Sequence, residues 1–334
     1  MNSNNYGTNG YANNCPIGIS DRGIPIFAPE IDLNTISEFL KFDSSKVSNI
    51  LQISELKKNS QKVERIKNEY YSIPYGKYYK CTVARKAENC NCKHRYYFCE
   101  AYDYNRVVLK SKIDEKNERN DYIAASHVDS YSIPGRFIAT QAPLPQTIDD
   151  FWSMVYERQS TQIVTLNQVV EGEYVKGDKF WPENTSEKFG SITVNNFQTN
   201  FFEDFIIRKY EVSSVEGSFE VEQFFFNQWP DHNIPNSCQS LLKLIDYVKK
   251  SPLHLMLNPA VIHCSAGVGR TGAFILLYNM IEMGEQSGKI DVFKNYLKLR
   301  KQRAYAIDCV EQYLFVYKCL SEYFIYQNFD FQNK

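Results

Sequence analysis

Residues 261–272 read Val-Ile-His-Cys-Ser-Ala-Gly-Val-Gly-Arg-Thr-Gly. The short apolar run 260–263 predicts a buried strand, and the apolar stretch 271–283 predicts a buried helix, so the segment between them is a tight loop that leads from strand to helix. Its glycines allow the backbone to curl until successive N–H groups point into one concavity. Such a concavity at the start of a helix, with the positive end of the helix dipole behind it, binds an anion.

Two reactive side chains stand on this loop. Arg270 carries a planar guanidinium fork that can hold two oxygens of a tetrahedral anion at once. Cys264 lies at the mouth of the concavity, where we expect the backbone dipoles and Arg270 to favour its thiolate over its thiol. The loop therefore offers a bound tetrahedral anion together with an in-line sulfur nucleophile.

Two other interpretations fit parts of the loop. Gly267, Gly269 and Gly272 match the spacing of a dinucleotide-binding fingerprint, but the residues that follow predict helices and no further strand with an acidic tip. A buried cysteine beside a tight turn would account for Cys264, but it would not account for an arginine six residues later inside a glycine cradle. The anion site with a nucleophile explains all of these residues together.

Composition excludes several classes of protein. The 334 residues include 38 basic and 39 acidic side chains, and the resulting net charge of −1 argues against a nucleic-acid or membrane-surface protein. No apolar run approaches the ~20 residues that a membrane span requires, and residues 1–14 lack the features of a signal peptide. Nine cysteines in a long chain do not indicate a disulfide framework. We expect a reduced cytoplasmic protein.

The pattern along the chain predicts one α/β domain over residues 26–330, preceded by a disordered or loosely attached tail over 1–25. Thr147 and Asp150 resemble a capping box at the start of a helix. Strands are expected at 162–166, 190–197, 205–212, 219–226 and 260–263, with short strands and turns over 93–140. Helices are expected from 36 to 71 with interruptions, after 147, around 241–248, at 271–283, at 292–303 and from 310 to about 326.

The segment HCSAGVGRTG at 263–272 resembles the signature of the cysteine-dependent protein tyrosine phosphatases. Further stretches resemble motifs of this family and follow the family's order. They are Lys93–Tyr96 with 102–107, 121–126, 140–145 with 150–152, Glu171 and Lys176 before 180–182, Trp229-Pro230-Asp231 and Glu311-Gln312-Tyr313. The resemblance implies a central, highly twisted, mostly mixed β-sheet flanked by helices on both sides. No metal or organic cofactor is implied, because the loop amides and Arg270 stabilise the charge.

The resemblance also implies roles for the loop residues. Cys264 would attack phosphorus to form a phosphocysteine intermediate, while Asp231 would protonate the departing tyrosine oxygen and later take a proton from water. Thr271 would hydrogen-bond the sulfur, and His263 would orient the cysteine. The equatorial phosphate oxygens would be held by Arg270 and the backbone of Ser265, Ala266, Gly267, Val268 and Gly269.

Residues outside the loop are expected to complete the site. Glu171 would fix the fork of Arg270, with Lys176 as its partner in the same segment. Tyr96 would line a deep slot that phosphotyrosine reaches and phosphoserine does not. Trp229 and Pro230 belong to the same motif as the expected general acid, Asp231.

Four positions near the expected site depart from the family. Asp308 occupies the place of the glutamine that positions the hydrolytic water, and Gln312, one helical turn later, could partly substitute for it. Phe98 replaces the Asp or Asn that holds the substrate backbone. His232 replaces a phenylalanine after the acid, and Tyr305 replaces a glycine that flanks the pocket.

We therefore expect an active, non-receptor, monomeric phosphatase specific for phosphotyrosine in proteins. The departures leave open a phosphotyrosine-binding module with weak turnover, and a dual-specificity or lipid phosphatase with the same cysteine chemistry is a third alternative. Cys90, Cys92 and Cys99 near His94 suggest zinc, but their spacing lacks a second matching pair, so reduced thiols are the expectation.

Overall fold

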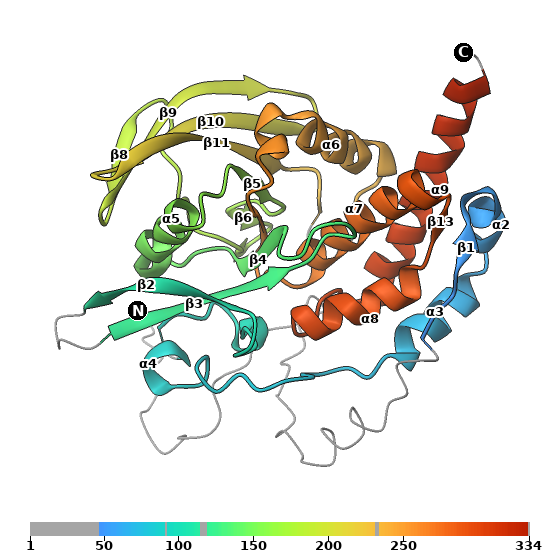
Figure 1. Ribbon diagram of the computed structural model, residues 1–334, viewed down its shortest axis with the longest axis horizontal. Coiled ribbons are helices and arrows are strands. Elements are labelled where there is room, and N and C mark those ends of the chain that lie inside the picture. Colours follow the sequence, from blue (N-terminus) through green and yellow to red (C-terminus); the bar gives the residue numbers. More distant parts are fainter. Residues whose placement is uncertain (1–46, 91, 114–118, 231–233, 333–334) are drawn as a thin grey trace.

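The computed structural model describes residues 47–90, 92–113, 119–230 and 234–332. Its centre is a mixed sheet of nine strands in the order β2-β3-β4-β12-β5-β11-β10-β9-β8 (Figure 1). The bounds of these strands, in that order, are Arg106–Ile113, Arg119–Val128, Phe137–Gln141, Ala260–Cys264, Gln162–Thr165, Gly217–Phe226, Phe205–Ser214, Ile192–Phe201 and Ser186–Phe189.

The four central strands β4, β12, β5 and β11 run parallel, whereas both flanks of the sheet are antiparallel. Every residue of β4, β12 and β5 is buried. Helices on both faces cover a parallel sheet, which explains this complete burial. The strand that ends in Cys264 is thus held on both edges by buried neighbours.

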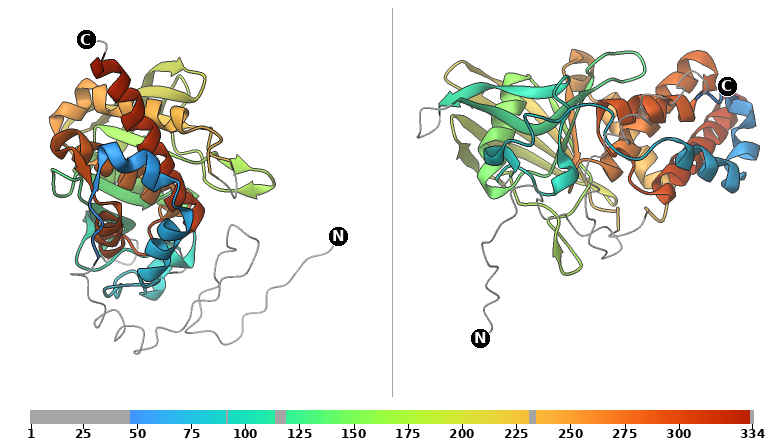
Figure 2. Two further views of the ribbon diagram at one scale, coloured as in Figure 1. Left: turned by 90° about the vertical axis from the view of Figure 1, so that its right-hand side faces the viewer. Right: turned by 90° about the horizontal axis from the view of Figure 1, so that it is seen from below.

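Successive residues of β12 point into two different cores. Val261 packs with the core under helix α5 (Ile148–Glu157), while Ile262 packs with the core on the opposite face of the sheet. That second core is built by four longer helices, which are α6 (Cys238–Lys250), α7 (Gly269–Ser287), α8 (Val292–Gln302) and α9 (Val310–Gln332). The two faces of the sheet are seen from other directions in Figure 2.

Smaller elements complete the described chain. Helices α2 (Leu56–Ser60) and α3 (Val63–Ser72) pack on α9, and β1 (Leu51–Gln52) pairs with β13 (Lys289–Ile290). The remaining elements are α4 (Ala87–Cys90), the hairpin β6 (Val170–Glu171) and β7 (Tyr174–Val175), and the 3₁₀ turns η2 (Ile53–Glu55), η3 (Tyr97–Cys99), η4 (Pro145–Thr147) and η5 (Pro252–Met256).

The predicted α/β class, with a mixed sheet flanked by helices on both sides, is confirmed. The capping box is wrong. Thr147 does precede α5, but its hydroxyl accepts a hydrogen bond from the N–H of Leu144 instead, and Asp150 pairs with Lys93. The preceding turn engages the side chain of Thr147, and a distant lysine engages that of Asp150. The predicted tail 1–25 and the predicted start of the domain at residue 26 lie outside the described residues.

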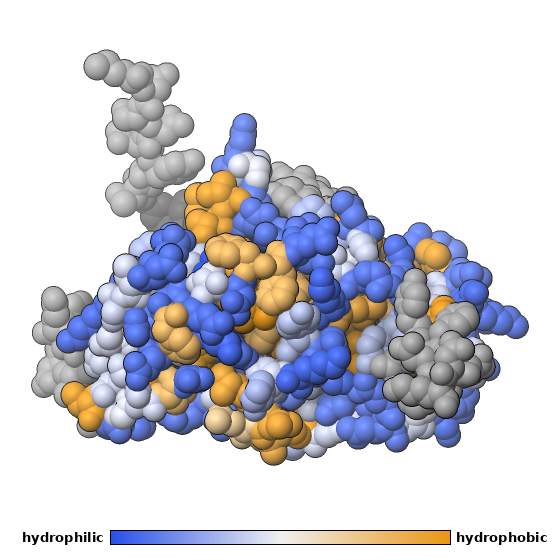
Figure 3. Space-filling view, turned by 90° about the horizontal axis from the view of Figure 1, so that it is seen from above, coloured by the Kyte–Doolittle hydropathy of each residue, from blue (hydrophilic) through white to orange (hydrophobic). Residues whose placement is uncertain are grey.

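Among the described residues, none of the helices combines the length and the apolar character needed to cross a bilayer. On the face shown in Figure 3, apolar side chains occur in small groups between hydrophilic ones.

Candidate active site

The glycine loop occupies residues 265–268, between the end of β12 at Cys264 and the start of α7 at Gly269. Gly267 has a φ of +67°, and a Cβ atom there would lie 2.0 Å from the main-chain oxygen of Thr140. Only glycine fits this position. The N–H of Ala142 donates to the carbonyl oxygens of Cys264 and Ser265, which turns both carbonyls toward β4.

The start of α7 lacks a side-chain cap. Val268 precedes the helix and its side chain cannot accept a hydrogen bond, so no side-chain cap satisfies the first N–H groups of α7. The loop 265–268 joins this helix start to Cys264, which is only 4 % exposed. This arrangement suits a bound anion in front of the sulfur.

Arg270 is held in place by Glu171 from the β6–β7 hairpin. Its two terminal nitrogens donate to the two carboxylate oxygens of Glu171 at 2.5 and 2.7 Å, and one of them also donates to the main-chain oxygen of Leu166 at 3.2 Å. The side chains of Arg270 and Glu171 are 11 % and 3 % exposed. A bidentate pair of this kind fixes the plane of the guanidinium.

Arg303 supports the loop from behind, and sequence reasoning missed it. This fully buried side chain donates to the carbonyl oxygens of Gly267 (3.0 Å) and Ala266 (3.4 Å), and to Ser126 Oγ (3.2 Å). By drawing two loop carbonyls to one side, it favours peptide orientations whose N–H groups point to the other side. Its position just after α8, with no motif around it, gave no local signal.

Tyr96 lies beside the loop. Its hydroxyl is 2.8 Å from Ser265 Oγ, and its ring is half-buried. Burial raises the pKa of Tyr96, so the hydroxyl stays protonated at neutral pH. The ring therefore forms a neutral wall next to Cys264.

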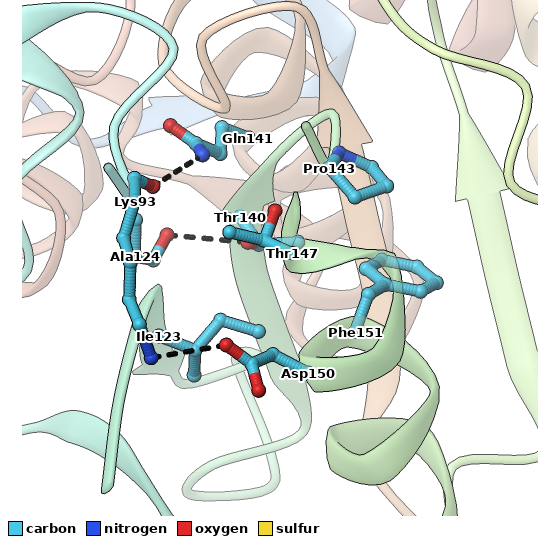
Figure 4. A pocket seen from close by; sticks show the side chains of 9 residues that line it. All are labelled: Lys93, Ile123, Ala124, Thr140, Gln141, Pro143, Thr147, Asp150 and Phe151. Carbon is cyan, nitrogen blue, oxygen red and sulfur yellow. Dashed lines mark hydrogen bonds and ion pairs between the residues drawn. The ribbon is translucent and has the colours of Figure 1, made fainter. Parts of the chain in front are cut away.

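The segment that carries Tyr96 is anchored by polar contacts. The amide of Gln141 accepts from the N–H of Arg95 (2.8 Å) and donates to the carbonyl oxygen of Lys93 (2.8 Å), and Lys93 pairs with Asp150 at 3.0 Å. Figure 4 shows the small pocket between these side chains. These bonds hold the start of the segment against β4 and α5.

His263 points away from the loop, into the core under α5. Its Nε2 lies 2.8 Å from Thr165 Oγ1, and the rings of Phe151 and Phe180 pack against it. Burial lowers the pKa of His263 to about 3, against an opposing contribution from the main chain of Cys264. The ring is neutral at physiological pH, and its link to Cys264 runs through the backbone.

Asp308 and Gln312 contact the start of α7. A Cβ atom on Gly269 would lie 2.4 Å from Asp308 Oδ1. In the orientation that satisfies both partners, the Gln312 amide nitrogen donates to Asp308 Oδ1 and to the carbonyl oxygen of Gly269, at 3.2 Å each. The hydroxyl of Thr271 is buried and has no hydrogen-bond partner among the described residues.

The tryptophan-proline motif approaches the loop. Trp229 is buried against Phe226 and Phe315, and the main-chain oxygen of Pro230 lies 3.5 Å from the Arg270 guanidinium. Asp231 and His232, which follow, lie outside the described residues.

Three further predicted residues lie around Tyr96 and the hairpin. Lys176 places its ammonium 5.6 Å from the ring centre of Tyr174, whereas Glu171 of the same hairpin contacts Arg270. The ring of Phe98 stacks on the ring of Tyr96, and the ring of Tyr305 contacts Phe98 edge-on. Cys92 and Cys99 are free thiols, whereas Cys90 is disulfide-bonded, so the expectation of a reduced thiol is wrong at Cys90. No cluster of potential metal ligands occurs in the described ranges.

Comparisons with known proteins agree with this geometry. Residues 90–322 match the family model described as protein-tyrosine phosphatase, which is well over half of the chain. Receptor-type tyrosine-protein phosphatase F of Bos taurus is 34% identical over 280 residues, covering 81% of this chain and 14% of the relative. The human protein of the same name gives the same figures.

Receptor-type tyrosine-protein phosphatase S of Gallus gallus is 33% identical over 301 residues, covering 89% of this chain and 19% of the relative. The chain thus spans less than a fifth of the length of these relatives. The family match, the shared sequence and the loop with its paired arginine lead to one assignment: the chain belongs to the protein-tyrosine phosphatase family.

Proposed function

We propose that the chain hydrolyses phosphotyrosine in proteins through a phosphocysteine intermediate on Cys264. The observation that carries the proposal is the fork of Arg270, fixed by both carboxylate oxygens of Glu171 beside the uncapped start of α7. Charge that develops on the equatorial oxygens of a transferred phosphoryl group needs such donors in fixed positions. We further expect a monomer that acts in the cytoplasm.

In the first step, the Cys264 thiolate attacks phosphorus. The S–P bond forms, the bond between phosphorus and the tyrosine oxygen breaks, and the Asp231 carboxylic acid gives that oxygen its proton. Since a phenol has a pKa near 10, a placed acid supplies ~10²–10⁴ in rate. Pro230, the residue before Asp231, is adjacent to Arg270, which favours Asp231 for this role.

In the second step, water attacks phosphorus and the Asp231 carboxylate takes its proton. The S–P bond breaks, inorganic phosphate is released, and the Cys264 thiolate is regenerated. We assign Thr271 as the donor to this sulfur, because its buried hydroxyl lacks another partner in the described structure. His263, neutral and fixed by Thr165, orients the cysteine through the backbone.

The test is steady-state turnover of a phosphotyrosine peptide, with a phosphothreonine peptide of the same sequence as control. The wild type should release phosphate only from the phosphotyrosine peptide. Cys264→Ser should abolish turnover and retain binding, and Asp231→Asn should lower kcat by about 10²-fold or more. Equal rates on both peptides would support the dual-specificity alternative, and binding without turnover by the wild type would support the binding module.

A further inference from the structure

A series of aromatic rings leads from the loop to the protein surface. It begins at Tyr96, whose hydroxyl contacts Ser265, and Tyr96 stacks on Phe98 with ring centres 5.4 Å apart and an interplanar angle of 12°. Phe98 meets Tyr305 edge-on at 6.4 Å, and Tyr305 contacts Tyr75 at 5.1 Å. We call these four rings, Tyr96, Phe98, Tyr305 and Tyr75, the aromatic ladder.

The aromatic ladder opens toward solvent at its outer end. Tyr96, Phe98 and Tyr305 are half-buried, and Tyr75 is 56 % exposed. Apolar ring faces therefore continue outward from the place where the ring of a bound phosphotyrosine would lie against Tyr96. A peptide that places its phosphate in the loop has to leave the site past these rings.

The backbone fixes the outer part of the ladder. Tyr305 has a φ of +60°, a left-handed conformation that is uncommon for a bulky residue and persists only where the surroundings impose it. The guanidinium of Arg300, itself buried, lies 4.9 Å from the ring centre of Tyr75. The rings are thus positioned before a ligand arrives, which reduces the entropy lost on binding.

Among the described residues, two cations beside the outer rings of the ladder have partners within the protein. Arg300 donates to the Tyr296 hydroxyl and to the carbonyl oxygen of Ile307. Lys77 lies over the ring of Tyr305 at 5.9 Å, but its buried ammonium forms an ion pair with Glu100. The outer part of the ladder consequently presents ring faces to a ligand, while Arg300 and Lys77 are engaged with groups of the protein.

We propose that the aromatic ladder selects substrates that carry an aromatic or large apolar side chain next to the phosphotyrosine. This inference rests on the proposed function, since it assumes that phosphotyrosine occupies the loop. Aromatic side chains gain from packing on fixed rings, both by burial of apolar area and by ring geometry. An acidic side chain at the same place would lose solvation against the ring faces, and Arg300 and Lys77 beside them are already paired.

The test uses synthetic phosphotyrosine peptides in which the two residues on each side are alanine, or in which one of them is replaced by phenylalanine or glutamate. We expect phenylalanine at one or more positions to raise kcat/KM about five- to tenfold over alanine, and glutamate to lower it. The effect should fall on KM, because the ladder does not touch the reacting atoms.

Two variants locate the effect on the ladder. In Tyr75→Ala and Tyr305→Gly, kcat/KM for the phenylalanine peptide divided by kcat/KM for the alanine peptide should fall toward one. Glycine suits the left-handed backbone at 305, so this variant should fold. Tyr71→Ala, which removes another exposed tyrosine that lies outside the ladder, should keep the wild-type ratio.

The same peptides are also measured for binding to Cys264→Ser by fluorescence anisotropy. This measurement separates the two proposals. A lack of turnover by the wild type would overturn the enzymatic function, whereas the binding affinities of the peptides would still test the role of the ladder. Tighter binding of phenylalanine peptides would support the ladder. No preference in binding, a preference for glutamate, or a ratio unchanged in both ladder variants would overturn it.

Discussion

The hydroxyl of Thr165 lies 2.8 Å from Nε2 of His263 and links strand β5 to the strand that ends in Cys264. Gln223 Nε2 donates to the same hydroxyl at 3.0 Å, and the Tyr210 hydroxyl donates to Gln223 Oε1 at 2.6 Å. Because Thr165 accepts from Gln223, its own proton is available for Nε2 of His263. Nδ1, on the other side of the ring, is buried near the main chain of Cys264.

Thr165→Val tests this link, since it removes one hydroxyl and leaves the shape of the side chain. We expect alkylation of Cys264 by iodoacetate at pH 6 to slow by about tenfold, with a similar loss of kcat, because the nucleophile is less well oriented. Thr161→Val is the matched control: it removes a buried hydroxyl that bonds Leu253. Equal effects of both variants on alkylation would contradict the link.

Glu171→Gln keeps the size of the side chain and removes the charge that fixes Arg270. The fork should lose its bidentate geometry, so Ki for inorganic phosphate and KM should rise, and kcat/KM should drop by roughly 10- to 100-fold. Glu183→Gln, in an exposed pair with Lys179, serves as control and should leave Ki, KM and kcat/KM unchanged. A wild-type Ki in Glu171→Gln would show that Arg270 needs no orienting partner.

Asp308 should slow the breakdown of the phosphocysteine. Its carboxylate lies against Gly269 at the start of α7, and its negative charge should repel a phosphoryl group on Cys264. Rapid mixing of the wild type with an aryl phosphate should therefore show a burst of phenol before slower turnover. Asp308→Gln should shrink the burst and raise the steady-state rate by about tenfold.

The control for this prediction is Glu311→Gln, at an exposed position in the same segment, which should leave the burst unchanged. A linear trace from the first milliseconds in the wild type would count against slow breakdown. So would a steady-state rate that Asp308→Gln leaves unaltered.

The strand, loop and helix around Cys264 could be predicted because their signals are local. A short buried apolar run, glycines at fixed spacing and a long apolar helix each depend on neighbouring residues only. The contacts of Arg303 and Thr165 with the loop and His263 could not be predicted, since both join strands and helices far apart in sequence. Neither residue type marks such a contact by itself.

Two features of the fold were missed because the local pattern does not show which partner a side chain takes. Thr147 and Asp150 satisfy the local capping pattern, yet Leu144 and Lys93 engage their side chains. The hairpin that carries Glu171 has strands of two residues, which are too short for a periodic signal. Its proximity to Arg270 was expected only from the family resemblance.

The free energy of unfolding should fall as the pH drops from 6.5 to 4. Burial, with nearby cations, lowers the pKa of His94 and His254 to about 4, and that of His263 to about 3, so the folded chain keeps these rings neutral while the unfolded chain takes up protons. Each ring then removes up to about 1.4 kcal/mol of stability per pH unit in this interval. Burial also lowers the pKa of His127. Urea unfolding at pH 7 and pH 5 measures the loss of stability, and His254→Gln should reduce the slope of that loss with pH. Stability that does not change between these pH values, or a slope that His254→Gln leaves intact, would refute the assignment of buried neutral rings.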